Sequence, residues 1–228
     1  MCKFERGSWT DLVQRLRRCG TKGDADLKPY QSARISMERV RIPELLPLAK
    51  YVLEEQLEVV ARLQDQLSPS GVDIFALECG ILWPNGRDER AITCPIVEQS
   101  EREGLLLVDG LHRIWVARDQ GRTEVTCAVI RDVQVPLVPL PVTWEEVRVF
   151  PLGQLPAEQD KRVYRFSDAA SLRSTFPSVS QKVTEENFRY FLYREFGELG
   201  SAGIRPPAAP IADPTKSLDR EASTRGEQ

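Results

Sequence analysis

Histidine is almost missing from this chain: His112 is the only one among 228 residues, so imidazole chemistry is confined to that position. The five cysteines are scattered and form no C-x-x-C pair, which argues against a thiolate zinc site and against a dithiol redox motif. We therefore expect reduced thiols that pack in the interior of the protein.

Long apolar runs and an excess of positive charge are also missing. No apolar run approaches the roughly 20 residues that a membrane-spanning helix needs. The first six residues include Lys3, Glu5 and Arg6 and lack the apolar core of a signal peptide. A formal net charge of −3 gives the whole chain no electrostatic drive towards nucleic acid. We expect a cytoplasmic protein that has no membrane partner and for which nucleic acid is not the expected ligand.

What the chain does contain is a middle part, residues 42–132, in which helical and strand patterns alternate. Apolar residues at helical spacing over 49–67 predict an amphipathic helix, and Ser68–Gly71 ends it with breaker residues. Short apolar runs predict strands over 92–97, 105–108 and 125–130. This order of elements predicts the fold class, an α+β core.

The segments around this core divide the chain into four parts. Residues 1–32 hold a helix over 9–18 and a polar connector, and residues 33–150 form the main domain, with a strand over 33–42. Residues 151–200 are predicted to form a small helical C-terminal extension. Its last helix follows Thr184, and its aromatic face is expected to pack in a core: Phe188, Phe191, Leu192 and Phe196. Residues 201–228 contain almost no large apolar residue, which predicts a disordered tail.

The most informative segment is Val108–Arg113, which reads Val-Asp-Gly-Leu-His-Arg. It follows the strand over 105–108 and precedes a helical stretch over 114–120 that Gly121 ends. A tight turn before a helix places free backbone N–H groups beside the charged side chains of the turn, and helix N-termini bind anions. The segment predicts a phosphate site; the alternative is that Asp109 only caps the helix.

The unit from Leu105 to Ile130 resembles the ParB/sulfiredoxin superfamily, in which a motif of this kind holds nucleotide phosphates. The resemblance implies a mixed sheet with flanking helices over 33–150 and a small C-terminal extension. Leu111 stands where sulfiredoxins carry a catalytic cysteine, which excludes sulfinic acid repair. Chromosome-partition ParB proteins carry an arginine where His112 stands, and they continue into a helix-turn-helix domain whose pattern does not follow Ile130.

Within this superfamily the sequence is most similar to the free-serine kinases, whose loop reads Val-Asp-Gly-His-His-Arg. Val108–Arg113 matches that loop, Glu54–Leu57 lies where these kinases have a His-Glu pair, and Thr143-Trp144 lies where they carry a tryptophan. Leu111 and Glu54 depart from the pattern, because each replaces a histidine. The resemblance implies a kinase that uses ADP or ATP with Mg²⁺ to phosphorylate the hydroxyl of free L-serine or a related amino acid.

The resemblance also implies a role for each matched residue. The nucleotide phosphates would be bound by Asp109, Gly110, His112 and Arg113, and Asp109 would in addition hold Mg²⁺ and act in catalysis. Glu55, at the edge of the apolar stripe of its helix, would be a partly buried general base, with Glu54 as the alternative. The acceptor amino acid would be bound by His112, Thr143 and Trp144. Without the resemblance, a solvated helix face is the preferred interpretation of Glu54 and Glu55.

The residues also fit two other functions. One is a relative of these kinases that binds a ligand and has lost catalysis. The other is a ParB-like DNA-binding or regulatory protein, in which a nucleotide such as CTP switches a conformation. An arginine-rich helix near the N-terminus, with Arg15, Arg17 and Arg18, would then contact phosphates.

Overall fold

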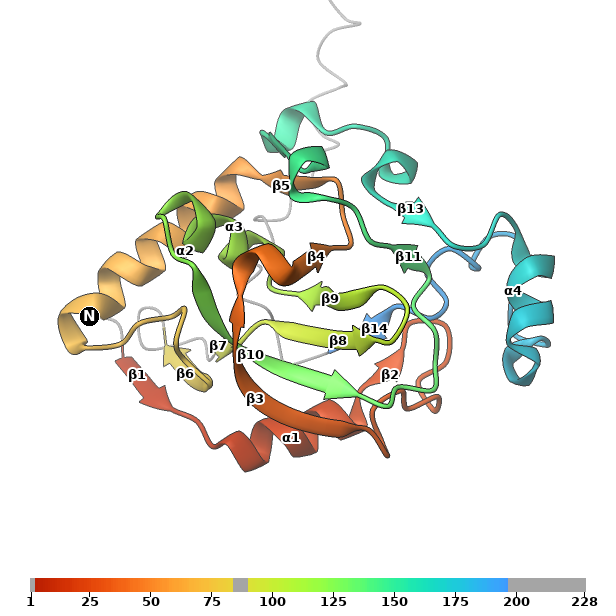
Figure 1. The fold of residues 1–228 in the computed structure, drawn as a ribbon, viewed down its shortest axis with the longest axis horizontal. Helices are drawn as coiled ribbons and strands as arrows, with labels where there is room; N and C mark the ends of the chain where they lie inside the picture. The colour runs from red at the N-terminus through yellow and green to blue at the C-terminus, as the bar shows by residue number, and fades with distance from the viewer. Residues whose placement is uncertain (1–2, 84–89, 197–228) are drawn as a thin grey trace, which may run out of the picture.

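The structure is a computed structural model, and it describes residues 3–83 and 90–196 (Figure 1). At its centre lies a five-stranded sheet of order β3-β10-β8-β9-β4. These strands are β3 (Arg34–Arg41), β4 (Leu45–Pro47), β8 (Ile96–Ser100), β9 (Gly104–Asp109) and β10 (Glu124–Arg131). Two neighbouring pairs are antiparallel, β3 with β10 and β8 with β9, whereas β10 with β8 and β4 with β9 are parallel. The predicted mixed sheet is therefore confirmed.

Smaller sheets surround this centre. A three-stranded antiparallel sheet is formed by β1 (Lys3–Arg6), β6 (Cys79–Trp83) and β7 (Arg90–Thr93). The two-stranded pairs are β5 (Tyr51–Leu53) with β12 (Arg148–Phe150), β11 (Pro139–Leu140) with β13 (Val163–Tyr164), and β2 (Gly20–Thr21) with β14 (Arg194–Glu195). The parallel pairing of β5 with β12 brings a late part of the chain beside the main domain.

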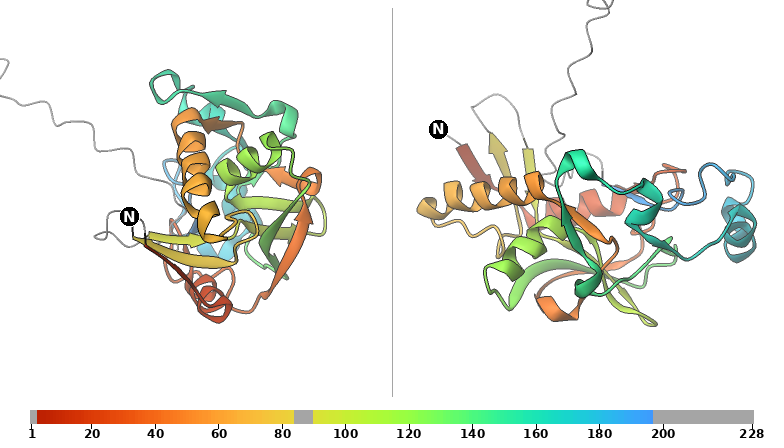
Figure 2. Two further views of the ribbon diagram at one scale, coloured as in Figure 1. Left: turned by 90° about the vertical axis from the view of Figure 1, so that its left-hand side faces the viewer. Right: turned by 90° about the horizontal axis from the view of Figure 1, so that it is seen from above.

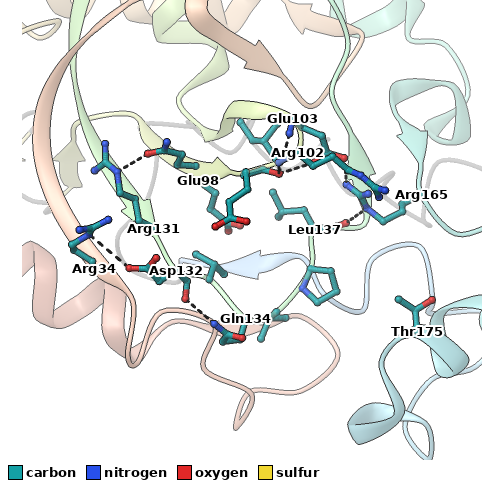
Figure 3. Close-up of a pocket in the computed structure, with 17 residues that line it drawn as sticks. Arg34, Glu98, Arg102, Glu103, Arg131, Asp132, Gln134, Leu137, Arg165 and Thr175 are labelled. Atoms are coloured by element: carbon teal, nitrogen blue, oxygen red, sulfur yellow. Dashed lines mark hydrogen bonds and ion pairs between the residues drawn. The ribbon is translucent and has the colours of Figure 1, made fainter.

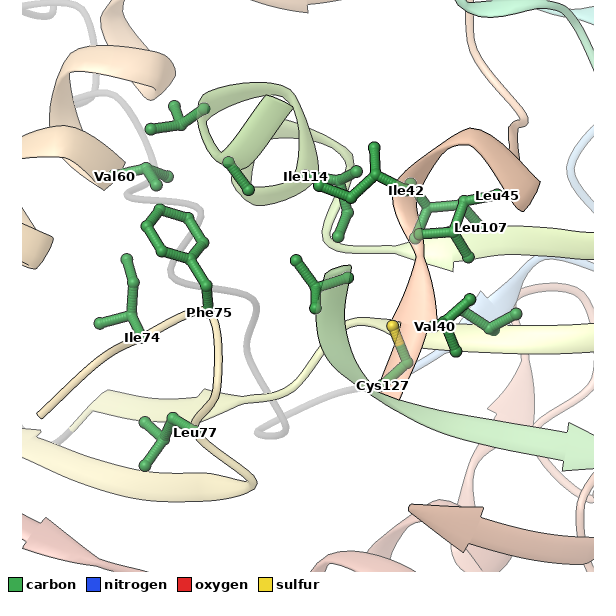
Figure 4. Packing of buried hydrophobic residues seen from close by; sticks show 14 of the residues in the cluster. Val40, Ile42, Leu45, Val60, Ile74, Phe75, Leu77, Leu107, Ile114 and Cys127 are labelled. Carbon is green, nitrogen blue, oxygen red and sulfur yellow. The ribbon is translucent and has the colours of Figure 1, made fainter. Parts of the chain in front are cut away.

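Helices cover both faces of the central sheet: α1 (Trp9–Arg18), α2 (Glu54–Leu67) and α3 (Leu111–Asp119). Side chains alternate between the faces of a strand, and β10 shows this clearly. Val125, Cys127 and Val129 pack in one cluster with α2 and α3, whereas Ala128 and Ile130 pack in another with α1. Because both faces are buried, β10 is an almost continuous apolar run. Figure 4 shows the first cluster, in which Ile114 of α3 lies near Ile42 and Leu107.

The C-terminal extension has a small core of its own. This core gathers residues on both sides of α4 (Ala169–Thr175), among them Phe166, Leu172, Phe188 and Phe191. Figures 1 and 2 show that α4 lies at the end of the molecule opposite β1 and β6. Phe188, Phe191 and Leu192 are thus core residues, as expected, whereas Phe196 is partly buried against the cluster that contains residues of α1.

A buried ion pair ties this extension to the central sheet. Arg194 donates to both carboxylate oxygens of Glu98 on β8, at 2.7 and 3.1 Å, and Tyr30 donates to the same carboxylate at 2.6 Å. The side chains of Arg194 and Glu98 are 0% and 7% exposed. Two buried charges are tolerated here because each is neutralised and hydrogen-bonded by the other.

Several predicted boundaries are wrong, and long-range contacts explain most of them. The helix expected over 49–67 begins at Glu54, because Tyr51–Leu53 pairs with β12 instead. The strand expected over 92–97 is interrupted at Cys94 and Pro95, after which β8 begins. The segment after Thr184 forms turns rather than a helix.

Two further expectations concern the tail and membranes. Residues 201–228, predicted to be disordered, lie outside the described residues. Within residues 3–83 and 90–196, no helix is both long and apolar enough to cross a membrane.

Candidate functional site

The Asp-Gly turn lies between the end of β9 and the first residue of α3. Gly110 has φ +96° and ψ 14°, in the left-handed region that side chains rarely adopt. A Cβ atom at Gly110 would lie 2.9 Å from Cβ of Pro95 and 3.0 Å from its Cα. The turn therefore also requires a residue without a side chain at this position. The helix starts at Leu111, three residues earlier than predicted, which makes Leu111, His112 and Arg113 its first turn.

A cavity of about 330 Å³ opens beside this turn, and we call it the loop cavity. One wall is formed by the end of β9 and the turn, and another by apolar side chains of β5 and α2 that include Leu53, Val60 and Leu63. The volume lies near the lower end of the range for small-molecule sites, roughly 300 to 1,000 Å³. The turn predicted to bind phosphate therefore lies beside a cavity and is not packed against other side chains on that side.

The loop cavity carries an excess of positive charge. Its described lining residues include three cations, Arg113, Lys161 and Arg162, and a single acid, Asp109. The first free N–H groups of α3 add partial positive charge at the same place. This excess among the described lining residues favours an anionic ligand.

His112 is neutral in this site. Its Nε2 accepts the N–H of Leu53 at 3.1 Å, so the ring proton is on Nδ1. Burial, with a smaller contribution from the charge of Lys161, lowers the pKa of His112 from 6.5 to about 4. At neutral pH the histidine adds no charge to the cavity, and it ties the turn to β5.

Asp109 and Arg113 influence each other's charge. Burial raises the pKa of Asp109, and the positive charge of Arg113 and the N–H of Gly110 act against that rise. Arg113 is 6% exposed, and its Nη1 donates to the carbonyl oxygen of Thr93. Burial lowers the pKa of Arg113, an effect that the carboxylate of Asp109 opposes. Arg113 thus supports the turn from the core as well as contributing charge to the cavity.

The comparison with known protein families bears on this turn. The model of the ParB CE domain family matches residues 11–148, more than half of the chain, and the match includes Asp109–Arg113. The chain belongs to this family. Neither a curated protein nor a solved structure gives a significant match. The ParB part of the predicted resemblance is therefore confirmed.

The predicted nucleotide residues lie together in the ParB domain, whereas the predicted base lies apart from them. Asp109, Gly110, His112 and Arg113 all line the loop cavity. Glu55 is exposed, and its two carboxylate oxygens accept the N–H of Leu152 at 2.9 and 3.1 Å. Its expected partial burial is wrong, because the first turn of α2 faces solvent. Its role as a general base stays a prediction. Glu54 is exposed as well.

The predicted acceptor residues after the last core strand are not at the cavity. Thr143 is exposed, and its N–H donates to the carboxylate of Glu146 at 2.8 Å, at the start of a single 3-10 turn, Trp144–Glu146. Trp144 is 8% exposed and packs in the main core, with its ring centre 6.3 Å from that of Trp115. Of the three predicted acceptor residues, His112 alone lines the loop cavity.

Sequence reasoning missed Lys161 and Arg162. Both lie beyond the residues that match the ParB CE domain, in a polar stretch without a motif. They reach the cavity only because β12 pairs with β5 and carries the following chain back across the main domain. No local signal in the sequence points to them.

A second and larger cavity, of about 740 Å³, lies at the turn between β8 and β9 (Figure 3). Its described lining contains four arginines and four acidic residues, so its charges balance. Most of these arginines are paired: Arg34 with Asp132 at 3.7 Å, Arg131 with Glu38 at 2.6 Å and Arg165 with Glu103 at 2.6 Å. This cavity shows no unbalanced charge, and the loop cavity is the stronger candidate site.

The described parts of the chain contain no group of three or more His, Cys, Asp or Glu residues placed to hold a metal ion. At the loop cavity, Asp109 is the one carboxylate among the described lining residues. Magnesium in phosphoryl-transfer sites is commonly held by one or two carboxylates, with phosphate oxygens and water as the other ligands. Asp109 supplies the one carboxylate that such a minimal set requires.

Proposed function

We propose that the loop cavity binds the phosphate groups of a nucleotide, and that the protein is a small-molecule kinase. The acceptor would be the hydroxyl of free L-serine or a related amino acid, and the donor ADP or ATP. The observation that carries the proposal is the charge of the cavity, in which three cations and the start of α3 face one carboxylate. Phosphoryl transfer depends mainly on positioning and on neutralising phosphate charge.

In this reaction the hydroxyl oxygen of the acceptor forms a bond to the terminal phosphorus of the nucleotide. The bond from that phosphorus to its bridging oxygen breaks, and the nucleotide leaves with one phosphate fewer. We assign the hydroxyl proton to the carboxylate of Asp109, because it is the one carboxylate among the described lining residues of the cavity. His112, with a pKa of about 4 and its Nε2 engaged with Leu53, is poorly suited to accept that proton.

A bound Mg²⁺ ion would offset part of the phosphate charge. Asp109 would be its protein ligand, and since a carboxylate has two oxygens, the same residue would serve both the ion and the acceptor hydroxyl. Glu55 remains the alternative base. It would have to give up its hydrogen bonds to Leu152 in order to reach an acceptor.

The test is incubation of the protein with L-serine, Mg²⁺ and ADP or ATP, followed by mass spectrometry for O-phosphoserine. Asp109→Asn should lower turnover by about 100-fold or more, because the amide cannot accept the proton. Glu55→Gln is the matched variant and should stay close to wild type, because the amide oxygen still accepts from Leu152.

The opposite pattern would identify Glu55 as the base. A wild-type protein that binds nucleotide and phosphorylates neither serine, threonine nor homoserine would be a binding protein without this activity.

A second candidate function rests on α1. A hollow of about 390 Å³ beside this helix is lined by Gln14, Arg17, Arg18, Lys28 and Gln31, three basic residues and no acidic one among those described. Such a surface favours phosphate groups of a nucleic acid backbone. The alternative is therefore a ParB-like protein whose nucleotide regulates DNA binding.

A measurement of binding to duplex DNA distinguishes the two functions. Binding that is tight at low salt, falls steeply as salt rises and is lost in Arg17→Ala/Arg18→Ala would favour the regulatory function, above all if no phosphorylated product forms. A kinase without DNA affinity would exclude it.

A further inference from the structure

The chain that follows the ParB match forms a strap across the start of α2. We define this strap as residues 148–162, which pass beside β5 in Figure 1. Three contacts hold it: the pairing of β12 with β5, the N–H of Leu152 on the carboxylate of Glu55, and the carbonyl oxygen of Lys161 on the N–H of Lys50 at 2.7 Å. The strap is therefore anchored at its beginning, its middle and its end.

The end of the strap contributes two of the three cations of the loop cavity. Lys161 and Arg162 both line it. The Nζ of Lys161 lies 5.2 Å from the centre of the Tyr51 ring, and its positive charge contributes to the low pKa of His112. The guanidinium of Arg162 lies 4.8 Å from the centre of the ring of Tyr193, a residue of the C-terminal extension.

We propose that Lys161 and Arg162 bind the phosphate chain of the nucleotide, and that Glu55 is a positioning residue that holds their strap. This inference rests on the proposed function, since it names further binding residues of the same site. Lys161 is the sharper case: its carbonyl oxygen accepts the N–H of Lys50, and its Nζ lies over the ring of Tyr51. The three cations together would face a ligand that carries several negative charges.

The side chain of Arg113 is largely buried in the core, so the cations of the strap are the more accessible ones for a ligand in the loop cavity. Arg113 is 6% exposed and donates to the carbonyl oxygen of Thr93. Lys161 and Arg162 are more accessible, with intermediate burial. The strap therefore carries two of the three cations that line the loop cavity. The N–H groups of α3 would add partial positive charge.

The experiment measures the affinity of the full chain for ATP, ADP and CTP, with adenosine and cytidine as uncharged probes. Lys161→Met removes the charge and keeps the length of the stem. It should weaken nucleotide binding by about tenfold or more at low salt, the scale of one charge-assisted contact. Lys161→Arg should restore most of the affinity, and binding of the nucleosides should change little.

Lys182→Met is the matched control, because Lys182 pairs with Asp24 on the surface and lies outside the described lining of the loop cavity. The role of Glu55 is tested in the same assay. Glu55→Ala should weaken ATP binding, Glu55→Gln should not, and Glu55→Ala should have little further effect in a Lys161→Met background. A merely structural role of Glu55 would give the same loss in both backgrounds.

The outcomes are distinguishable. If the wild type binds none of the three nucleotides, the proposed function fails and this inference fails with it. If the wild type binds nucleotide and Lys161→Met binds as tightly, the inference alone is overturned. Equal losses in Lys161→Met and Lys182→Met would also overturn it, since the effect would then be non-specific. Circular dichroism of each variant identifies a loss of binding that comes from misfolding. If Lys161→Met misfolds, the affinity of Lys161→Arg for nucleotide tests the inference instead, and a Lys161→Arg protein that folds but does not bind nucleotide would overturn it.

Discussion

Acidification should destabilise this protein through its single histidine. His112 has a pKa of about 4 in the folded protein and 6.5 as the ordinary value of an exposed histidine. Between these pH values the unfolded chain binds a proton that the folded chain does not, so stability falls as pH falls. Protonation would also remove the acceptor of the Leu53 N–H and place a positive charge beside Lys161.

The two pKa values give the size of the effect. Lowering the pH from about 7.5 to about 5 should cost about 2 kcal/mol, and the loss should approach about 3 kcal/mol below pH 4. The sequence has no second histidine to obscure this range. Asp109 acts in the opposite sense, because its raised pKa favours the folded state at low pH, so a reference variant is needed.

The assay is urea unfolding of the wild type and His112→Gln at a series of pH values. The glutamine amide can accept from Leu53 but does not titrate in this range. The difference between the two stability curves isolates His112, because every carboxylate is common to both proteins. A difference that stays constant from pH 7.5 to pH 5 would refute the neutral, buried histidine described here.

Other predictions concern the turn and the buried ion pair. Gly110→Ala should lower the free energy of unfolding by about 3 kcal/mol, because it combines a left-handed backbone with a contact on Pro95. Gly121→Ala is the control: its φ is +72° but no described atom lies within 4 Å of a Cβ there, so about 1 kcal/mol is expected in urea unfolding. Arg194→Met should cost about 3 to 5 kcal/mol, since it leaves the Glu98 carboxylate buried without its cation. The double variant with Glu98→Gln should regain part of that loss, and additive losses would show that the pair is not coupled.

The parts of the fold that sequence could predict are those set by local pattern. Val125–Ile130 is β-branched and apolar on both faces, and it forms the central strand β10. The Asp-Gly turn before α3 followed from its own residues. Such features depend on neighbours in the chain, so a single sequence carries enough information to locate them.

The parts that sequence could not predict depend on contacts between distant residues. Tyr51–Leu53 continues a helical pattern, yet it becomes β5 because β12, almost 100 residues later, pairs with it. The same pairing brings the strap to the cavity and gives Glu55 a backbone partner, Leu152, instead of a buried place. Trp144 was assigned to the site by resemblance, whereas its packing against Trp115 is a core contact.

The ion pair between β8 and β14 has a consequence for how the protein is made. Glu98 lies on a strand inside the central sheet, and its cation is residue 194, near the end of the described chain. During synthesis the ParB domain emerges first and would begin to fold with an uncompensated carboxylate in its interior. We expect the domain to reach its final stability only after Arg194 has left the ribosome, so folding of this protein is completed late in translation.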